Sequence, residues 1–69
     1  MKYQTVHAGY VKVGDTLYEG GLLLRVRAIS REYDDEGNMA LCFTCKCGNS
    51  ITRDYRFRKY ANVVLAKGQ

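Results

Sequence analysis

The stretch LLLRVRAISREYDDEGNMALCFTCKC, residues 22–47, decides the fold. In its first part Leu24, Val26 and Ala28 are apolar at every second position, which is the period of a half-buried strand. We therefore predict a long strand over 22–33 with its even residues turned inward. The odd positions, which would face outward, include the arginines of this segment, Arg25, Arg27 and Arg31.

A hairpin follows this strand. The run DDEGN (34–38) is acidic and contains Gly and Asn, which tolerate positive φ, so it predicts the hairpin loop. Residues 39–47 predict the returning strand, and its odd positions are the inward ones: Met39, Leu41, Phe43, Cys45 and Cys47. After the turn at Cys47-Gly48-Asn49-Ser50, a third strand is predicted over 51–57, with Ile51, Tyr55 and Phe57 inward.

Two shorter strands complete the prediction. One lies near Val11, Val13 and Leu17, and the other is the β-branched run at 63–65. Helix is disfavoured because the long segments alternate with period two, and we expect at most one helical turn at 58–62. Five strands with short connectors would leave edges exposed unless the sheet curls onto itself. The prediction is an all-β protein with a small barrel.

The order of these segments resembles the SH3-like small barrels of ribosomal KOW-type modules and of small bacterial and phage proteins. Four features carry the resemblance: VKVGD at 11–15, the loop through Gly20-Gly21, the turn at Gly37, and YRFRKYANV at 55–63. The resemblance covers about residues 10–66. It implies a five-stranded SH3-like barrel with one short 3-10 turn before the last strand.

Length and composition indicate one small domain over residues 1–69. An extra strand is expected within 1–9 and a tail at 67–69. Hydrophobic residues make up 46% and charged residues 26% of the chain, which is typical of a globular protein. The sequence shows neither a signal peptide nor an apolar run long enough to span a bilayer, so we expect a cytoplasmic protein that does not engage the membrane.

Positive charge is concentrated in the second half of the chain. Residues 1–36 carry five Lys and Arg against six Asp and Glu, whereas residues 37–69 carry six against one. The run TRDYRFRKY (52–60) interleaves cations with aromatic rings, a mixture that suits phosphates and bases. The sequence predicts a nucleic-acid-binding face, for DNA or RNA, made of Arg25, Arg27, Arg31, Arg53, Arg56, Arg58, Lys59 and Tyr60. The alternative is that these charges pair with carboxylates and only keep the sheet soluble.

The three cysteines and the single histidine are the residues that could bind a metal. Cys42, Cys45 and Cys47 together with His7 would form a Cys₃His set for zinc. On a straight strand, however, Cys42 points away from the other two, and the chain has no second CxxC pair. We therefore predict reduced cysteines, with Cys45 and Cys47 in the core and Cys42 on the opposite face, no metal site and no cofactor.

Catalytic motifs are absent from the sequence, including the P-loop, GxSxG and HExxH patterns, so we predict a binding module and not an enzyme. Two other interpretations stay open. One is a protein-interaction module, such as a phage or mobile-element product that binds and modulates an acidic host protein, with Tyr10, Tyr18, Tyr33 and Tyr60 as anchors. The other is a homodimer formed by continuing the sheet at an unpaired edge.

Overall fold

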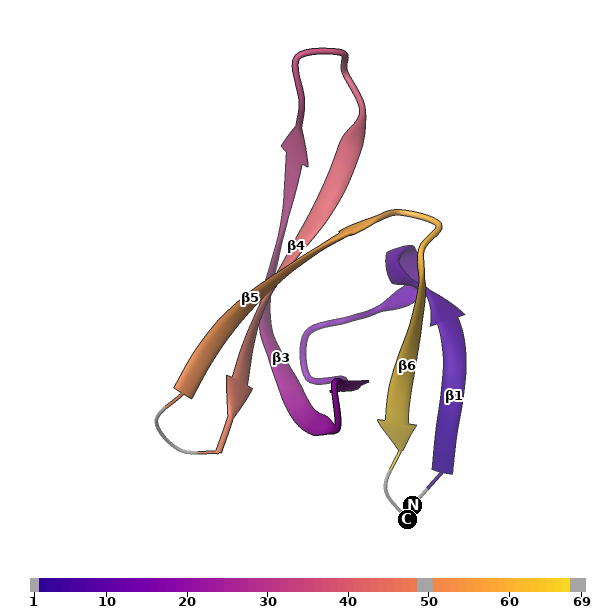
Figure 1. Cartoon of the computed structure of the whole chain (residues 1–69), viewed down its shortest axis with the longest axis vertical. Helices are drawn as coiled ribbons and strands as arrows, with labels where there is room; N and C mark the ends of the chain where they lie inside the picture. Colours follow the sequence, from indigo (N-terminus) through magenta and orange to yellow (C-terminus); the bar gives the residue numbers. More distant parts are fainter. Residues whose placement is uncertain (1, 49–50, 68–69) are drawn as a thin grey trace.

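The computed structural model describes residues 2–48 and 51–67 and shows one antiparallel sheet of six strands. The elements in chain order are β1 (Lys2–His7), η1 (Ala8–Tyr10), β2 (Thr16–Glu19), β3 (Leu22–Tyr33), β4 (Met39–Cys47), β5 (Ile51–Arg58) and β6 (Asn62–Lys67). The strand order is β1-β6-β2-β3-β4-β5 (Figure 1). Within the described residues, no helix is long and apolar enough to cross a membrane.

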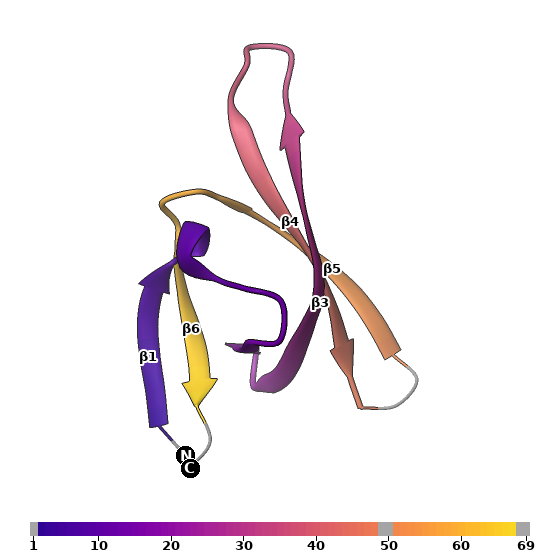
Figure 2. The ribbon, with the colours of Figure 1, turned by 180° about the vertical axis from the view of Figure 1, so that it is seen from behind.

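The all-β prediction is confirmed, but the closed five-stranded barrel is wrong. The sheet is open, with β1 at one end and β5 at the other. The reason lies in the N-terminal segment, because β1 pairs along its whole length with β6, from Lys2 opposite Lys67 to His7 opposite Asn62. The outer side of β6 is therefore occupied by β1 and is not available to β5. Figure 2 shows the β1–β6 pair standing apart from the β3–β4–β5 layer.

Two local predictions near the ends of the chain are also wrong. Residues 11–15 form a loop in place of a strand, with the Lys12 backbone N–H donating to the Asp15 carboxylate at 2.9 Å and Gly14 at φ +98°. The 3-10 turn lies at Ala8–Tyr10, between the first two strands, and not before the last strand. The segment after β5 is a simple turn closed by the Ala61 N–H on the Arg58 carbonyl at 3.0 Å.

The long hairpin β3–β4 organises the sheet, and a bulge divides β3 in two. Val26 lies opposite Cys45, but the next paired residue is Ala28, opposite Thr44, so Arg27 has no counterpart in β4. The inward positions of β3 are even-numbered up to Val26 and odd-numbered from Ile29, which lies opposite the buried Phe43. The predicted inward position of Ala28 is therefore wrong, and this residue is exposed.

Among the described residues, β3 is paired on both sides only at Arg25 and Val26, because its pairing with β4 begins at Arg25. β2 covers residues 22–25, and the loop before β2 continues the contact for one more residue. There the Gly14 N–H donates to the Val26 carbonyl, and the Val26 N–H donates to the Asp15 carbonyl, both at 2.9 Å. Beyond this point the described part of the chain offers β3 no partner besides β4, and the hairpin projects past the other strands (Figure 1).

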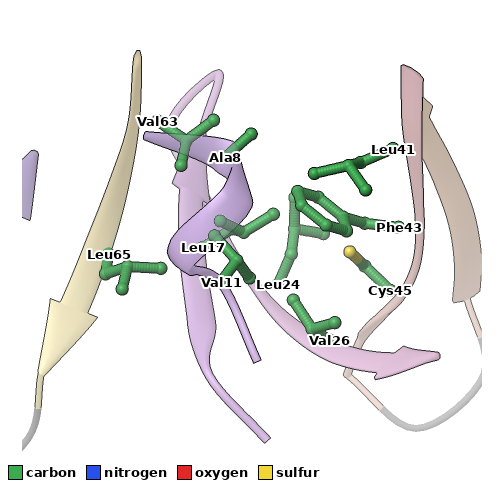
Figure 3. Packing of buried hydrophobic residues seen from close by; sticks show 10 residues of the cluster. All are labelled: Ala8, Val11, Leu17, Leu24, Val26, Leu41, Phe43, Cys45, Val63 and Leu65. Atoms are coloured by element: carbon green, nitrogen blue, oxygen red, sulfur yellow. The ribbon is translucent and has the colours of Figure 1, made fainter. Parts of the chain in front are cut away.

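The core lies where the two parts of the curled sheet face each other. Its buried members converge from η1, β2, β3, β4, β6 and the loop before β2 (Figure 3): Ala8, Val11, Leu17, Leu24, Val26, Leu41, Phe43, Cys45, Val63 and Leu65. Phe43 is fully buried and stands 5.8 Å from the ring centre of Phe57 in β5. The inward parity predicted for residues 39–47 is confirmed at Leu41, Phe43 and Cys45.

The hairpin loop is held by one carboxylate. The Asp34 carboxylate accepts from the backbone N–H of Asn38 at 2.8 Å and of Glu36 at 2.9 Å. The Asn38 side-chain amide donates to its second oxygen at 3.2 Å. These bonds favour the ionised form, and the Asn38 backbone N–H contributes most to lowering the pKa of Asp34 below its ordinary 3.8.

The adjacent leucines of β3 test the assignment of faces. Leu24 is fully buried whereas Leu23 is 42% exposed on the other side of the same strand. We expect Leu24→Ala to lower the free energy of unfolding by about 2–5 kcal/mol, since it leaves a cavity. We expect Leu23→Ala to cost about 1 kcal/mol or less. Urea unfolding followed by circular dichroism measures both, and equal losses would contradict the assignment.

The Asp34 loop gives a pH-dependent prediction. Because the pKa of Asp34 is lower in the folded chain than in the unfolded chain, its stabilising effect is present above pH 3.8. The effect is lost as the pH falls through the folded pKa. Asp34→Ala should therefore be less stable than the parent at neutral pH, and the difference should vanish in acid. Thermal melts from pH 7 to pH 2 measure it, with Asp35→Ala as the control, and a constant difference at all pH values would refute it.

Candidate nucleic-acid interface

Register decides which face of the β3–β4–β5 layer each charged side chain occupies. Residues directly opposite one another in an antiparallel sheet point to the same face. We call the face that carries Val26, Phe43 and Cys45 the core face and the opposite one the outer face. The outer-face rows across the three strands are Arg25–Lys46–Thr52, Ala28–Thr44–Asp54, Ser30–Cys42–Arg56 and Glu32–Ala40–Arg58.

Three cations surround a hollow at one end of the outer face. Arg25 lies directly opposite Lys46, and Arg27, the bulged residue of β3, lies beside them. The hollow measures about 370 Å³, and its other described lining residues are Thr16, Leu23 and Gly48. We call it the basic hollow. The described lining residues of this hollow include no carboxylate, and the one in the lining of a neighbouring hollow is Asp15, on the side of Arg25 away from the strand of Lys46.

Two further arginines share the outer face. Arg56 lies opposite Cys42 and Arg58 opposite Ala40. Arg56 forms an ion pair with Glu32 of β3 at 2.7 Å, in which both side chains remain largely exposed. This is the pairing that the alternative interpretation of the arginines expects, and an exposed pair of this kind contributes little to stability.

The two groups of cations lie along one direction of the sheet. Lys46 and Cys42 are four residues apart on β4, a separation of about 13 Å at the rise of an extended strand. A nucleic-acid strand carries one phosphate per about 3.4 Å of helix axis, so about four phosphates cover this span. Arg25, Arg27, Lys46, Arg56 and Arg58 thus form one outer-face set.

Two of the predicted arginines lie on the core face instead. Arg31 is opposite Leu41, and Arg53 is opposite Cys45. Both side chains are exposed because they lie beyond the margin of the core. The prediction that Arg31 shares a face with Arg25 and Arg27 is therefore wrong, and the bulge at Arg27 is the physical reason.

Lys59 and Tyr60 belong to a separate cluster in the turn between β5 and β6. The Tyr60 ring meets the His7 ring edge-on at 5.7 Å between centres, and Tyr10 stands 6.1 Å from His7 on another side. The Lys59 ammonium lies 5.5 Å from the Tyr60 ring centre. Tyr10 and Tyr60 are each 71% exposed, and the cluster encloses a hollow of about 240 Å³.

A close backbone contact builds this aromatic cluster. The Gly9 N–H donates to the Lys59 carbonyl at 3.0 Å, and the Ala8 N–H donates to the Ala61 carbonyl at 2.8 Å. A Cβ on Gly9 would stand 3.2 Å from Lys59 Cγ, so a larger residue here requires the Lys59 side chain to shift by a few tenths of an ångström. The N-terminal 3-10 turn thus brings His7 and Tyr10 to a turn about fifty residues later in the chain.

The cysteines and His7 do not come together. Cys45 and Cys47 share the core face, Cys42 lies on the outer face, and His7 belongs to the aromatic cluster. No group of three potential metal ligands is present among the residues that the structure describes. Burial raises the pKa of the Cys45 thiol, and the nearby Asp54 carboxylate adds to this shift.

Lys46 is the residue that the sequence interpretation missed. It stands on the outward parity of β4, but it is separated along the chain from the aromatic and basic run at 52–60. Its importance follows from the register, which sets it opposite Arg25. Its outward parity on the predicted strand was the available signal for it, whereas its pairing with Arg25 depends on the bulge at Arg27.

Comparison with models of known protein families finds no match for this chain, and comparison with curated proteins finds none either.

Thiol reactivity tests the placement of the cysteines. Cys42 and Cys47 are half-buried, whereas Cys45 is fully buried and its pKa is raised. In the folded protein we expect two thiols to react with an aromatic disulfide reagent at pH 8, and the third to react only after unfolding. Mass spectrometry of the labelled chain identifies the slow residue as Cys45. Equal rates for all three thiols, or a slow residue other than Cys45, would contradict the fold.

Proposed function

We propose that the protein is a non-enzymatic binding module that engages nucleic acid through the outer face of β3, β4 and β5. The observation that carries the proposal is the basic hollow. Arg25 and Lys46 face each other directly without a carboxylate between them among the described lining residues, and Arg27 adds a third cation. Such an arrangement is unfavourable by itself and becomes favourable when an anion binds between the cations.

Phosphate contacts supply most of the affinity in this proposal. Arginine presents several N–H donors to phosphate oxygens, and lysine adds a mobile point charge. The Thr16 hydroxyl lines the same hollow and adds a neutral donor. Arg56 and Arg58 extend the contact along the strands, with Arg56 exchanging its Glu32 partner for phosphate.

The outer face offers little for reading a base sequence. The described outer-face rows of β3, β4 and β5 consist of cations, two acids and small or short side chains, without an aromatic ring. Binding of DNA or RNA through the backbone follows from this composition, and strong salt dependence comes with it. We retain, as part of this proposal, a relationship to the SH3-like small barrels. A curled sheet with short turns is compatible with such a relationship.

A matched pair of double variants tests the proposed face. Each double variant removes two positive charges from the β3–β4–β5 layer. The charges come from the outer face in Arg25→Ala/Arg27→Ala and from the core face in Arg31→Ala/Arg53→Ala. We expect the first variant to weaken binding and to reduce the slope of log Kd against log salt by about two, about one for each lost phosphate contact. We expect the second variant to stay close to the parent in both respects.

Fluorescence anisotropy with single- and double-stranded oligonucleotides measures these values from 20 mM to 200 mM salt, and thermal melts verify that both variants are folded. Absence of micromolar binding by the parent at low salt would refute the proposal. Equal losses in the two double variants would show that net charge, and not the outer face, governs binding.

Protein docking is the second candidate function, and the aromatic cluster favours it. Tyr10 and Tyr60 expose large amphipathic rings beside His7, and rings of this kind anchor protein interfaces. In this second candidate function the chain is a phage or mobile-element product that binds an acidic host protein, and the positive charge of Lys59 beside the aromatic cluster suits such a partner. A Tyr10→Ser/Tyr60→Ser variant separates the candidates, because it removes a nuclease-resistant partner from a pull-down and leaves oligonucleotide binding through the outer face unchanged.

A further inference from the structure

The open sheet leaves three strand edges without a partner in the described chain: β1, the part of β3 beyond Val26, and β5. Each presents backbone N–H and C=O groups that another strand could pair with. β5 is the longest of these free edges, with eight residues, no proline and no break in its register against β4. Its free edge is therefore a regular template for one more strand.

Geometry restricts how such an edge can pair with a second copy of itself. On an edge strand, alternate residues present both backbone groups outward. A two-fold pairing of identical strands must therefore set odd residues opposite odd residues and even opposite even. This condition also keeps the core faces of both copies on the same side of the joined sheet.

Self-complementary ion pairs then require an acid and a base of the same parity on one edge. β5 meets this requirement with Asp54 and Arg56. β1 carries Lys2 without an acid. The free part of β3 carries Glu32 at an even position and its arginines at odd positions, so no allowed register pairs them.

Among two-fold axes in the middle of β5, from Arg53 to Phe57, charge selects a single register. A two-fold axis at Arg53, Asp54 or Arg56 sets like charges directly opposite each other, and an axis at Phe57 sets Arg56 against Arg58 twice. Like charges in these positions destabilise strand pairing. An axis at Tyr55 instead sets Asp54 opposite the second copy's Arg56 twice and creates no like-charge pair, and Arg56 then lies between Glu32 of its own chain and Asp54 of the second copy.

The core face supports the same register. Tyr55 and Phe57 stack with ring centres 6.4 Å apart and planes 11° apart, and both rings are only half-buried in one chain. An axis at Tyr55 sets the two Tyr55 rings together and sets Arg53 against the second copy's Phe57, where its guanidinium can cover the ring. Arg53, a charge on the core face at a sheet edge, thereby acquires a partner.

We propose that β5 is a homodimerisation edge, on which a second copy adds its own β5 antiparallel about a two-fold axis at Tyr55, with two reciprocal Asp54–Arg56 pairs. The joined sheet has twelve strands and one continuous outer face. The inference rests on the edge and its charges, and it does not depend on nucleic-acid binding.

Charge reversal and its rescue test the proposal. Sedimentation equilibrium of the reduced, nuclease-treated protein should show a mass that rises with concentration from 7.9 kDa toward twice that value. Asp54→Arg sets arginines opposite each other and should keep the mass at that of one chain over the same concentrations. The double variant Asp54→Arg/Arg56→Asp restores opposite charges and should recover the dimer.

Asp35→Arg is the matched control, because it makes the same change of charge in the hairpin loop and should dimerise like the parent. Hydrogen exchange adds a readout that needs no variant: amides of β5 should gain protection with concentration, whereas those of β1 and of β3 beyond Val26 should not. A parent protein that stays monomeric, a double variant that fails to recover the dimer, or protection at another edge would overturn the proposal.

Discussion

The bulge between Val26 and Ala28 is the constraint on which the arrangement of this sheet depends. A regular strand of twelve residues would keep its even positions on one face throughout. Because of the extra residue, the inward-facing positions of β3 are even-numbered up to Val26 and odd-numbered from Ile29. The part of β3 before the bulge pairs with β2, and the part after it extends with β4 alone. Arg27 stays outward beside Arg25, and the same event moves Arg31 to the core face. Packing and charge distribution therefore have one common cause.

Core and binding surface occupy opposite sides of the same three strands. The core face of β4 contributes Leu41, Phe43 and Cys45 to the buried cluster, so the side chains on its outer face do not take part in the core. Lys46 is placed there by the alternation of β4, and Arg25 by that of β3. A small sheet that is covered on one face only keeps the other face for a ligand, and its ends keep two strand edges for a partner.

Sequence reasoning predicted the elements better than their assembly. The strand at 22–33, the loop at 34–38 and the strand at 39–47 follow from alternation and turn chemistry and match β3 and β4. The bulge has no such signal, since neither glycine nor proline marks position 27. The pairing of β1 with β6 is a contact between the two ends of the chain, and it decides that the sheet stays open. The outward positions of Arg25 and Lys46 follow from the alternation of their strands, whereas their direct pairing and the position of Arg31 both depend on the bulge and could not be predicted.

Side-chain contacts of Phe43 test the central role of the bulge most directly. In a nuclear Overhauser spectrum of the folded protein, the Phe43 ring should contact the Ile29 side chain, which lies opposite it across the β3–β4 pair. The Ala28 methyl group should give no contact to this ring, because Ala28 lies opposite Thr44 on the outer face. Cys45 should pair with Val26 in the same spectrum. A regular strand would give either a Phe43–Ala28 contact in place of Phe43–Ile29 or a pairing of Cys45 with Arg27 in place of Val26, and either result would contradict the account of both faces.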